Sequence, residues 1–377
     1  VTNLEINKDE SNLTDPGIRS DPLTSIIEKY NRHPSILSIR NVMTQSEEKV
    51  FEFSFVSKSE ISDELVKLNK AKASPSNDVP VKIIKENLDL LGYFLYNNFN
   101  NSLFSCDFPN GMKLAEIKPI FKKDDKTNKE NYRPISILPA LSKVYEKLMY
   151  NQIYNYFESF FSKFQCGFRK GIGAQDCLLS MIEKWRLSLD KGDQAGGVLT
   201  DLSKAFDCID HELLIAKLVA YGFSINSIHF MYSYLDRRCQ RAKINSSFST
   251  WEEIYFGVPQ GSILGPLLFN IFICDLFYEV KDIDINNYAD DNTPYACASD
   301  ISIIVSKLES GTNTLCKWFK ENHLKFNADK CHLVTSSNEP VSVTISGLPV
   351  VNEKRVKLLG INIEGRLGFD FHVNKLC

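Results

Sequence analysis

Two predicted strand ends that carry aspartates constrain the fold of this chain more than any other feature. Residues 197–201 (GVLTD) predict a short apolar strand that ends at Asp201, and residues 285–297 (INNYADDNTPYAC) predict a hairpin whose turn holds Asp290 and Asp291. If the two ends lie side by side, Asp201 and Asp290 can face a pair of divalent metal ions, for which carboxylates are suitable ligands. Adjacent strand residues point to opposite faces, so Asp291 is expected to have the weaker role. Taken alone, an Asp-Asp pair is more often ordinary turn chemistry.

Helical and strand patterns are mixed along the rest of the chain. Residues 1–56 show little periodicity, and we expect an extended or poorly ordered leader there. Helices are predicted to start near Ser59 and Pro80 and to cover residues 141–157, 175–189, 211–221 and 300–322, with an apolar helix from about Ser262. Strands are predicted within residues 113–121, 135–138, 241–258, 332–336, 341–345 and 356–361. Because strands and helices do not alternate regularly, the pattern favours an α+β fold over a doubly wound sheet.

Composition narrows the class of protein. With 377 residues, 43% hydrophobic and 24% charged, the chain is of the globular rather than the disordered type. The most apolar stretch, residues 263–277, is too short and too interrupted for a bilayer span, so we expect no membrane partner. Ten scattered cysteines without zinc spacing indicate free thiols in a reducing compartment, which predicts an intracellular location, cytoplasmic or nuclear.

Charge is informative in its distribution rather than in its total. The net charge of −3 disfavours a nucleic-acid partner slightly, but the acid excess lies in the first 65 residues. Residues 111–133 and 236–243 are rich in lysine and arginine, and such stretches could line a phosphate-binding groove. A solvated charged face is the equally good alternative for either stretch alone.

Three further segments contain candidate functional residues. Gln260 lies between a proline and glycines in residues 256–268 (FGVPQGSILGPLL), where glycine permits close approach of a ligand or backbone and the amide offers a donor and an acceptor. Lys122, Lys123 and Arg133 flank the turn of a basic hairpin and suit a triphosphate. Lys330 precedes a strand and is a candidate proton donor to a leaving pyrophosphate. The alternatives are a plain loop before a core helix, a solvated hairpin and an ordinary exposed lysine.

Seven motifs, taken in order, resemble those of the reverse transcriptases of non-LTR (LINE-like) retrotransposons. The resemblance covers about residues 60–375, and within that family the jockey-like elements of animals are the most similar. The motifs are NYRPISIL (131–138), FQCGFRKG (164–171), LTDLSKAFDCIDH (199–211), GVPQGSILGPLLFN (257–270), YADD (288–291), LKFNADK (324–330) and KLLGI (357–361).

The resemblance implies an RNA-directed DNA polymerase that adds dNTPs to the 3′-OH of a DNA primer on an RNA template. It implies a right-hand polymerase with fingers and palm and two Mg²⁺ ions, for which Mn²⁺ is a substitute. Its site residues, carried over by position, are the metal carboxylates Asp201, Asp290 and Asp291, the general acid Lys330, the dNTP-binding residues Lys122 or Lys123, Arg133, Phe206 and Gln260, and the primer-grip residues Leu358, Leu359 and Gly360. Phe206 matches the aromatic residue that excludes a ribose 2′-hydroxyl.

The same resemblance divides the chain into three regions. Residues 1–56 are the leader, residues 57–196 are the fingers-side helices with the basic hairpin, and residues 197–377 are the palm with the metal site and the primer grip. The reverse transcriptase domain itself is expected at about residues 113–365. Two departures are visible: Thr200 stands where the family usually has an apolar residue, and residues 72–80 lack a commonly present glycine.

Two alternatives remain open from the sequence. The family continues into a helical thumb beyond the primer grip, so we expect the thumb to be absent or truncated and the chain to be a piece of a longer polyprotein. A truncated, inactive fragment with residual nucleic-acid binding is therefore the first alternative. An RNA-directed RNA polymerase is the second, and Phe206 disfavours it. The sequence indicates neither the template, the target site nor the oligomeric state.

Overall fold

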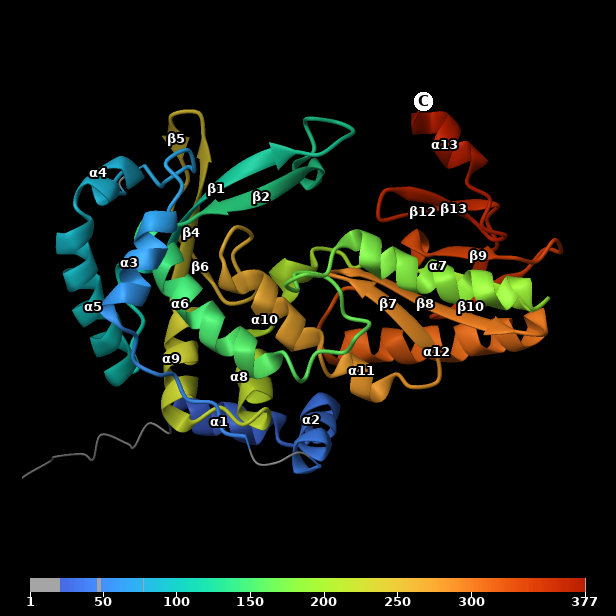
Figure 1. Ribbon diagram of the computed structural model, residues 1–377, viewed down its shortest axis with the longest axis horizontal. Coiled ribbons are helices and arrows are strands. Elements are labelled where there is room, and N and C mark those ends of the chain that lie inside the picture. Colours follow the sequence, from blue (N-terminus) through green and yellow to red (C-terminus); the bar gives the residue numbers. More distant parts are fainter. Residues whose placement is uncertain (1–20, 46–48, 77, 377) are drawn as a thin grey trace, which may run out of the picture.

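A four-stranded antiparallel sheet forms the centre of the C-terminal half in the computed structural model, which describes residues 21–45, 49–76 and 78–376 (Figure 1). Its strand order is β7(Asp284–Tyr288), β8(Asp291–Ala298), β3(Gln194–Leu199), β9(His332–Thr335). Helix α7(Ala174–Asp190) and helix α12(Ile301–Glu321) cover its two faces. Glycines in β3 make room for both helices, because a Cβ on Gly196 would meet Ile304 of α12 at 3.0 Å and one on Gly197 would meet Trp185 of α7 at 3.4 Å.

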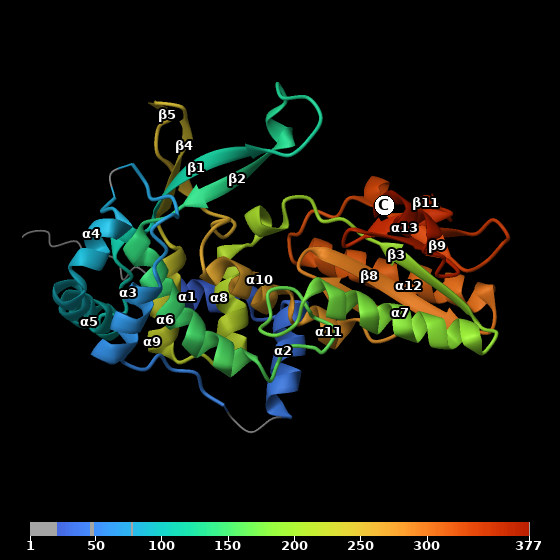
Figure 2. The ribbon, with the colours of Figure 1, turned by 45° about the horizontal axis from the view of Figure 1, so that its top comes forward.

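A second sheet joins segments from both halves of the chain. The hairpin of β1(Leu114–Phe121) and β2(Tyr132–Ile137) pairs through β1 with β4(Arg238–Ile244), and this pairing is parallel (Figure 2). Strand β4 also pairs with β5(Ser247–Phe248) and β6(Glu252–Ile254). Two separate hairpins, β10(Ser342–Ile345) with β11(Leu348–Val351) and β12(Arg355–Leu358) with β13(Ile361–Glu364), follow β9. Helix α13(Asp370–Leu376) comes last.

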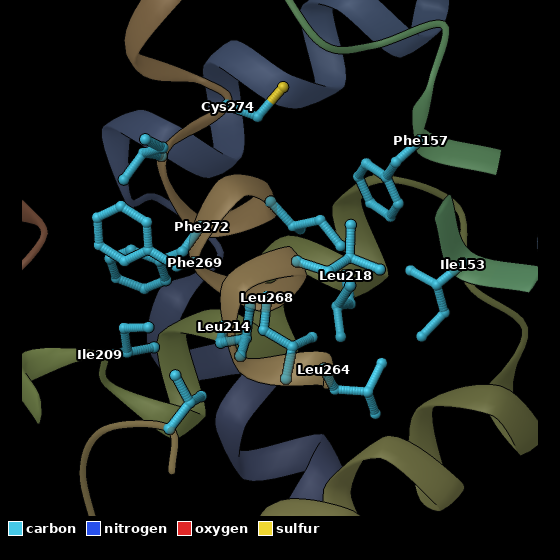
Figure 3. Close-up of a cluster of buried hydrophobic side chains, with 14 of the residues drawn as sticks. Ile153, Phe157, Ile209, Leu214, Leu218, Leu264, Leu268, Phe269, Phe272 and Cys274 are labelled. Carbon is cyan, nitrogen blue, oxygen red and sulfur yellow. The ribbon is translucent and has the colours of Figure 1, made fainter. Parts of the chain in front are cut away.

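The largest hydrophobic core extends from the helices around the second sheet to α12 and the four-stranded sheet. The helices are α3(Lys58–Lys67), α4(Val81–Glu86), α5(Leu88–Phe104), α6(Ala140–Phe157), α8(His211–Ala220), α9(Ile225–Leu235), α10(Leu264–Ile273) and α11(Leu276–Glu279). Figure 3 shows Leu214 and Leu218 of α8 packed against Leu264 and Leu268 of α10. Helix α10 is apolar on all sides because other elements surround it.

A buried ion pair connects these helices to the sheet region. Lys217 of α8 donates to Asp275 at 2.6 Å, and neither side chain is exposed. The indole of Trp318 in α12 donates to the other oxygen of Asp275 at 2.8 Å. These three residues therefore join α8, α11 and α12. Removing either partner of the ion pair would leave the other charge buried and unpaired, which strongly destabilises a fold.

Most helix and strand predictions are confirmed, with boundaries moved by a few residues. Helix α3 starts earlier than expected, because Ser57 rather than Ser59 is the N-cap and forms a capping box with Glu60. The helix expected from Pro80 is broken at Asn87 into α4 and α5. Helix α9 and strands β11 and β13 were not predicted. The mixture of helices with mainly antiparallel sheets agrees with the predicted α+β class.

The prediction of an extended leader over residues 1–56 is wrong for residues 22–44. They form α1(Pro22–Tyr30) and α2(Pro34–Thr44), each with proline in the first turn and a side-chain N-cap, Asp21 or His33. Helix α1 docks on α8, where Tyr30 donates to Asp210 at 3.3 Å. Residues 1–20 and 46–48 of the predicted leader lie outside the described residues.

The predicted division at residue 196 does not match the spatial arrangement. Helix α7 precedes that position but packs on the sheet that follows it, through a cluster that includes Trp185, Tyr295 and Val334. Strand β4 follows that position but pairs with β1. Sequence order therefore does not separate the two regions. Within the described residues, no helix is long and apolar enough to cross a membrane.

Candidate active site

The two aspartate-bearing strand ends lie side by side, as predicted. Strand β3 runs antiparallel to β8, and Thr200 forms a bridge with Asn292, so Asp201 lies beside the start of β8. Tyr288 pairs with Asp291 across the β7–β8 turn, which leaves Ala289 and Asp290 as the two turn residues. Ala289 has φ 57°, a left-handed conformation that L-residues rarely adopt.

Electrostatic effects show that the three carboxylates share one environment. Burial raises the pKa of Asp290, the charge of Asp201 raises it further, and Arg133 and Lys122 lower it. Burial, followed by the charges of Asp290 and Asp201, raises the pKa of Asp291 to about 6. Neighbouring carboxylate charges thus disfavour the ionisation of Asp290 and Asp291, and a bound cation would favour it.

The residue types of the site fit a hard divalent cation. In the described part of the chain, no group of three or more His, Cys, Asp or Glu side chains is gathered closely enough to hold a metal ion as it stands. The Lys330 ammonium donates to Asp201 Oδ2 at 3.0 Å and so supplies positive charge there. Carboxylate oxygens are the ligands that Mg²⁺ prefers, so the residue types fit the ion that the sequence implies.

The segment after Asp201 contains Phe206, whose ring packs against two other aromatic rings. Phe206 lies in the short 3₁₀ helix Ala205–Cys208 and is half-buried. Its ring stacks on Phe269 of α10 with a centroid distance of 4.7 Å, and Phe168 meets it edge-on at 5.7 Å. Two aromatic neighbours therefore fix the orientation of this ring.

The Gln260 loop is packed between that 3₁₀ helix and strand β2. The Gln260 side-chain amide donates to Asp207 at 2.8 Å, and the backbone carbonyl of Gln260 accepts from the backbone N–H of Ser136 at 2.8 Å. A Cβ on Gly257 would lie 2.8 Å from Asp207 Cα, and one on Gly261 would lie 2.4 Å from the Ser136 carbonyl oxygen. Both glycines also have positive φ, so the predicted close approach is confirmed and occurs between backbones.

The basic hairpin places Lys122 and Arg133 toward the carboxylates but directs Lys123 elsewhere. Both Lys122 and Arg133 are exposed, and both lower the pKa of Asp290. Lys123 instead lies 4.0 Å from Asp124. Of the two lysines that the sequence left open, Lys122 is thus the better candidate. Lys204, which the sequence analysis passed over, joins the hairpin loop to the Phe206 segment through Glu130 at 2.8 Å.

The predicted primer-grip residues form the turn of the β12–β13 hairpin. Leu359 and Gly360 both have positive φ, at 47° and 89°, which is typical of a tight hairpin turn. Leu358 is buried in the cluster under α7. Among the described residues, no hydrogen bond or ion pair joins this turn to the three carboxylates.

Sequence reasoning missed the residues that support the β7–β8 turn from behind. A Cβ on Gly167 would lie 2.2 Å from the backbone nitrogen of Ala289, so only glycine fits there. Asn287 and Asn292 flank the Asp pair and are buried. Asparagine is uncommon in strand interiors, and its recurrence around the two aspartates was the available signal.

Comparison with known proteins assigns the family. The chain belongs to the reverse transcriptase (RNA-dependent DNA polymerase) family, whose model matches residues 120–363. Within that family it is a reverse transcriptase domain of the non-LTR retrotransposon type.

The relatives include RNA-directed DNA polymerases of mobile elements and an intron protein. The chain is 27% identical over its whole length to the RNA-directed DNA polymerase from mobile element jockey of Drosophila melanogaster, of which it covers 41%. It is 30% identical over 71% of its length to the probable RNA-directed DNA polymerase from transposon BS of the same species, of which it covers 31%. A putative COX1/OXI3 intron 1 protein of Saccharomyces cerevisiae is 27% identical over 54% of the chain. The chain thus spans well under half the length of these relatives.

Proposed function

We propose that this chain is an RNA-directed DNA polymerase that adds dNTPs to the 3′-OH of a DNA primer paired with an RNA template. The observation that carries the proposal is the meeting of Asp201 with Asp290 and Asp291, with Lys122 and Arg133 acting on Asp290. Acidic ligands facing basic side chains suit a metal-bound triphosphate. Family membership supports this reading over other phosphoryl-transfer chemistry.

In this proposal the sheet β7-β8-β3-β9 with α7 and α12 is the palm. The β1–β2 hairpin, its sheet and the helices α3 to α6 are the fingers. This assignment differs from the division predicted from sequence, because α7 packs on the palm sheet and β4 joins the fingers sheet. Asp201 and the Asp pair lie where β3 ends and β8 begins, at one end of the two central palm strands.

The carboxylates of Asp201, Asp290 and Asp291 would hold the divalent ions. Mg²⁺ bound there would favour ionisation of the primer hydroxyl and neutralise charge on the leaving pyrophosphate, with Mn²⁺ as a substitute. Arg133 and Lys122 bind the triphosphate, since both are exposed and act on Asp290. We assign Lys330 Nζ, 3.0 Å from Asp201, as the proton donor to pyrophosphate.

Two residues are proposed to select the nucleotide. Phe206 forms a wall against the sugar, because Phe269 and Phe168 prevent its ring from turning away. Gln260 is held by Asp207 and Ser136 beside that wall, where its amide can meet a base or sugar edge. Leu358, Leu359 and Gly360 are proposed to contact the primer end. The intracellular location stays a prediction.

The test is dTTP incorporation on poly(rA)/oligo(dT) with Mg²⁺, comparing the parent with Asp290→Ala. We expect incorporation by the parent and its loss in the variant. If folded parent protein binds the template but incorporates nothing, the chain is a nucleic-acid-binding domain and the proposal is wrong. Ribonucleotide incorporation in preference to dTTP would instead indicate an RNA-directed RNA polymerase.

A further inference from the structure

Two buried amides hold both residues of the β7–β8 turn. Asn287 precedes the turn, and its Nδ2 donates to the Ala289 carbonyl at 2.8 Å and to Asn292 Oδ1 at 2.9 Å. Asn292 follows the turn, and its Nδ2 donates to the Asp290 carbonyl at 3.1 Å. The exposed fractions of Asn287 and Asn292 are 0% and 2%. Each turn carbonyl is therefore bonded by an amide from a flanking strand, and the two amides are bonded to each other.

Thr200 extends this network to the strand that carries Asp201. Both the backbone N–H and the hydroxyl of Thr200 donate to the carbonyl of Asn292, at 3.0 and 2.9 Å. Asn292 thus contacts Asp290 through its side chain and the residue before Asp201 through its backbone. The hydroxyl at position 200, which departs from the apolar residue usual in the family, has a structural partner.

The opposite side of the turn rests on residues 164–167. The Cys166 N–H donates to the Asn287 carbonyl at 2.9 Å, and the Asn287 N–H donates to the Phe164 carbonyl at 3.1 Å. The Gly167 carbonyl accepts from Asn270 of α10 at 2.7 Å. The turn is consequently supported by the helix that follows the Gln260 loop.

This arrangement lowers the stability of the fold, which indicates that it serves function. Ala289 keeps a left-handed backbone without being glycine, which persists only where the surroundings enforce it. Asn287 Oδ1 and Asn270 Oδ1 are buried without a hydrogen-bond partner among the described residues. Buried polar atoms left unpaired destabilise a fold, so a network selected for stability alone would be apolar here.

We propose that Asn287, Asn292 and Thr200 are positioning residues that fix the backbone of Asp290 and Asp291 relative to that of Asp201, so that the three carboxylates can come together on a divalent cation. The inference rests on the proposed function, since it concerns the same carboxylates. The amides do not contact the cation. They fix the two carbonyls of the turn, and thereby the direction in which both carboxylates leave the backbone.

The experiment measures Mn²⁺ binding directly, by loss of the free-Mn²⁺ electron paramagnetic resonance signal, with no nucleotide present. The variants are Asn287→Leu, Asn292→Leu and the double variant, with Asp290→Ala to identify the site. The matched control is Asn322→Leu, which removes another fully buried amide that bonds Ser35 and the Trp318 carbonyl in α12. We expect about tenfold weaker Mn²⁺ binding for each single variant, because carboxylate spacing governs affinity for a hard cation.

The double variant tests whether the amides act as one unit. The two amides bond each other, so their losses should not add. We expect the Mn²⁺ affinity of the double variant to be at most about twofold lower than that of the single variant with the lower affinity. Independent, additive losses would overturn a shared positioning role. Asn322→Leu should bind Mn²⁺ as the parent does, even if it melts at a lower temperature. A comparable loss of binding in Asn322→Leu would overturn the inference by showing that general destabilisation is the cause.

A milder pair of variants covers the case in which the asparagine variants do not fold. Thr200→Val keeps the volume but removes the hydroxyl, and Thr200→Ser retains the hydroxyl. We expect about threefold weaker Mn²⁺ binding for Thr200→Val and parental binding for Thr200→Ser. Parental binding in folded Thr200→Val would overturn the inference even if the parent incorporates dTTP. Conversely, a parent that binds Mn²⁺ in this residue-dependent way yet incorporates nothing would contradict the proposed function alone.

Discussion

Gly167→Ala is expected to disable synthesis without unfolding the chain. The added Cβ would lie 2.2 Å from the Ala289 nitrogen, whereas ordinary contacts begin at 3.4 Å. The neighbouring atom belongs to the backbone of the turn, so no side chain can rotate away. The turn that carries Asp290 must therefore retreat by about 1 Å, a displacement that typically lowers a rate by about 10²-fold.

That loss corresponds to about 2.7 kcal/mol of activation free energy. Overpacking of a buried site also lowers the free energy of unfolding by about 1–3 kcal/mol, which leaves most of a chain of this size folded. We expect the rate loss to appear in kcat rather than in KM for dTTP, because Lys122 and Arg133 come from a different element, the β1–β2 hairpin.

The assay is initial-rate dTTP incorporation on poly(rA)/oligo(dT) over a range of dTTP concentrations, with circular dichroism to establish folding. Gly111→Ala is the matched control, since a Cβ there has no atom within 4 Å and the backbone is not left-handed. A Gly167→Ala enzyme whose kcat stays within twofold of the parent would show that the turn does not need this backing, and would refute the reasoning.

Three further predictions concern single side chains. Phe206→Ala should raise ribonucleotide incorporation at least about tenfold relative to dNTP, measured by competition, because the wall held by Phe269 is removed; unchanged selectivity would take Phe206 out of that role. Lys330→Ala should lower kcat about 10²-fold, because the proton donor to pyrophosphate is removed, and a kcat within twofold of the parent would exclude Lys330 as the acid. Burial, then Asp275 and Glu321, raise the pKa of Glu279 to about 7 from an ordinary 4.5. The stability that the protonated carboxyl contributes is therefore present below pH 4.5 and lost as the pH rises through 7. Glu279→Gln should then be more stable than the parent at pH 8 by about 1–2 kcal/mol, after allowance for partial exposure, with little difference at pH 4.5 in urea unfolding; equal stabilities at pH 8 would contradict this.

Local patterns in the sequence were sufficient to predict the central part of the site. The apolar strand before Asp201 and the alternation around Asp290 are properties of neighbouring residues, so both strand ends could be located without the fold. The glycines around Gln260 likewise indicated a close approach, although only the structure identifies Ser136 and Asp207 as the partners.

Other features depend on contacts between distant residues. Glycine is required at position 167 because the backbone of Ala289 lies against it. The choice of Lys122 over Lys123 depends on the conformation of the hairpin loop, which brings Lys122 near Asp290 and Lys123 near Asp124. Helix α1, in contrast, has a local signal in the sequence. Leu23, Ile26 and Tyr30 have helical spacing and are buried in the hydrophobic core. Their signal was short and lay among polar residues, which led to the prediction of an extended leader.

The parallel pairing of β1 with β4 has a consequence for folding during synthesis. The β1–β2 hairpin is complete once Ile137 has been made, but its neighbour β4 ends at Ile244. At about 5–20 residues per second, the ribosome needs roughly 5–20 s to supply that strand. During this interval one edge of the hairpin has unpaired backbone groups, which is the state most prone to association with other chains. The second sheet is therefore completed only after both β1 and β4 have been made, and a fragment that ends between β2 and β4 is expected to leave β1 without this neighbour.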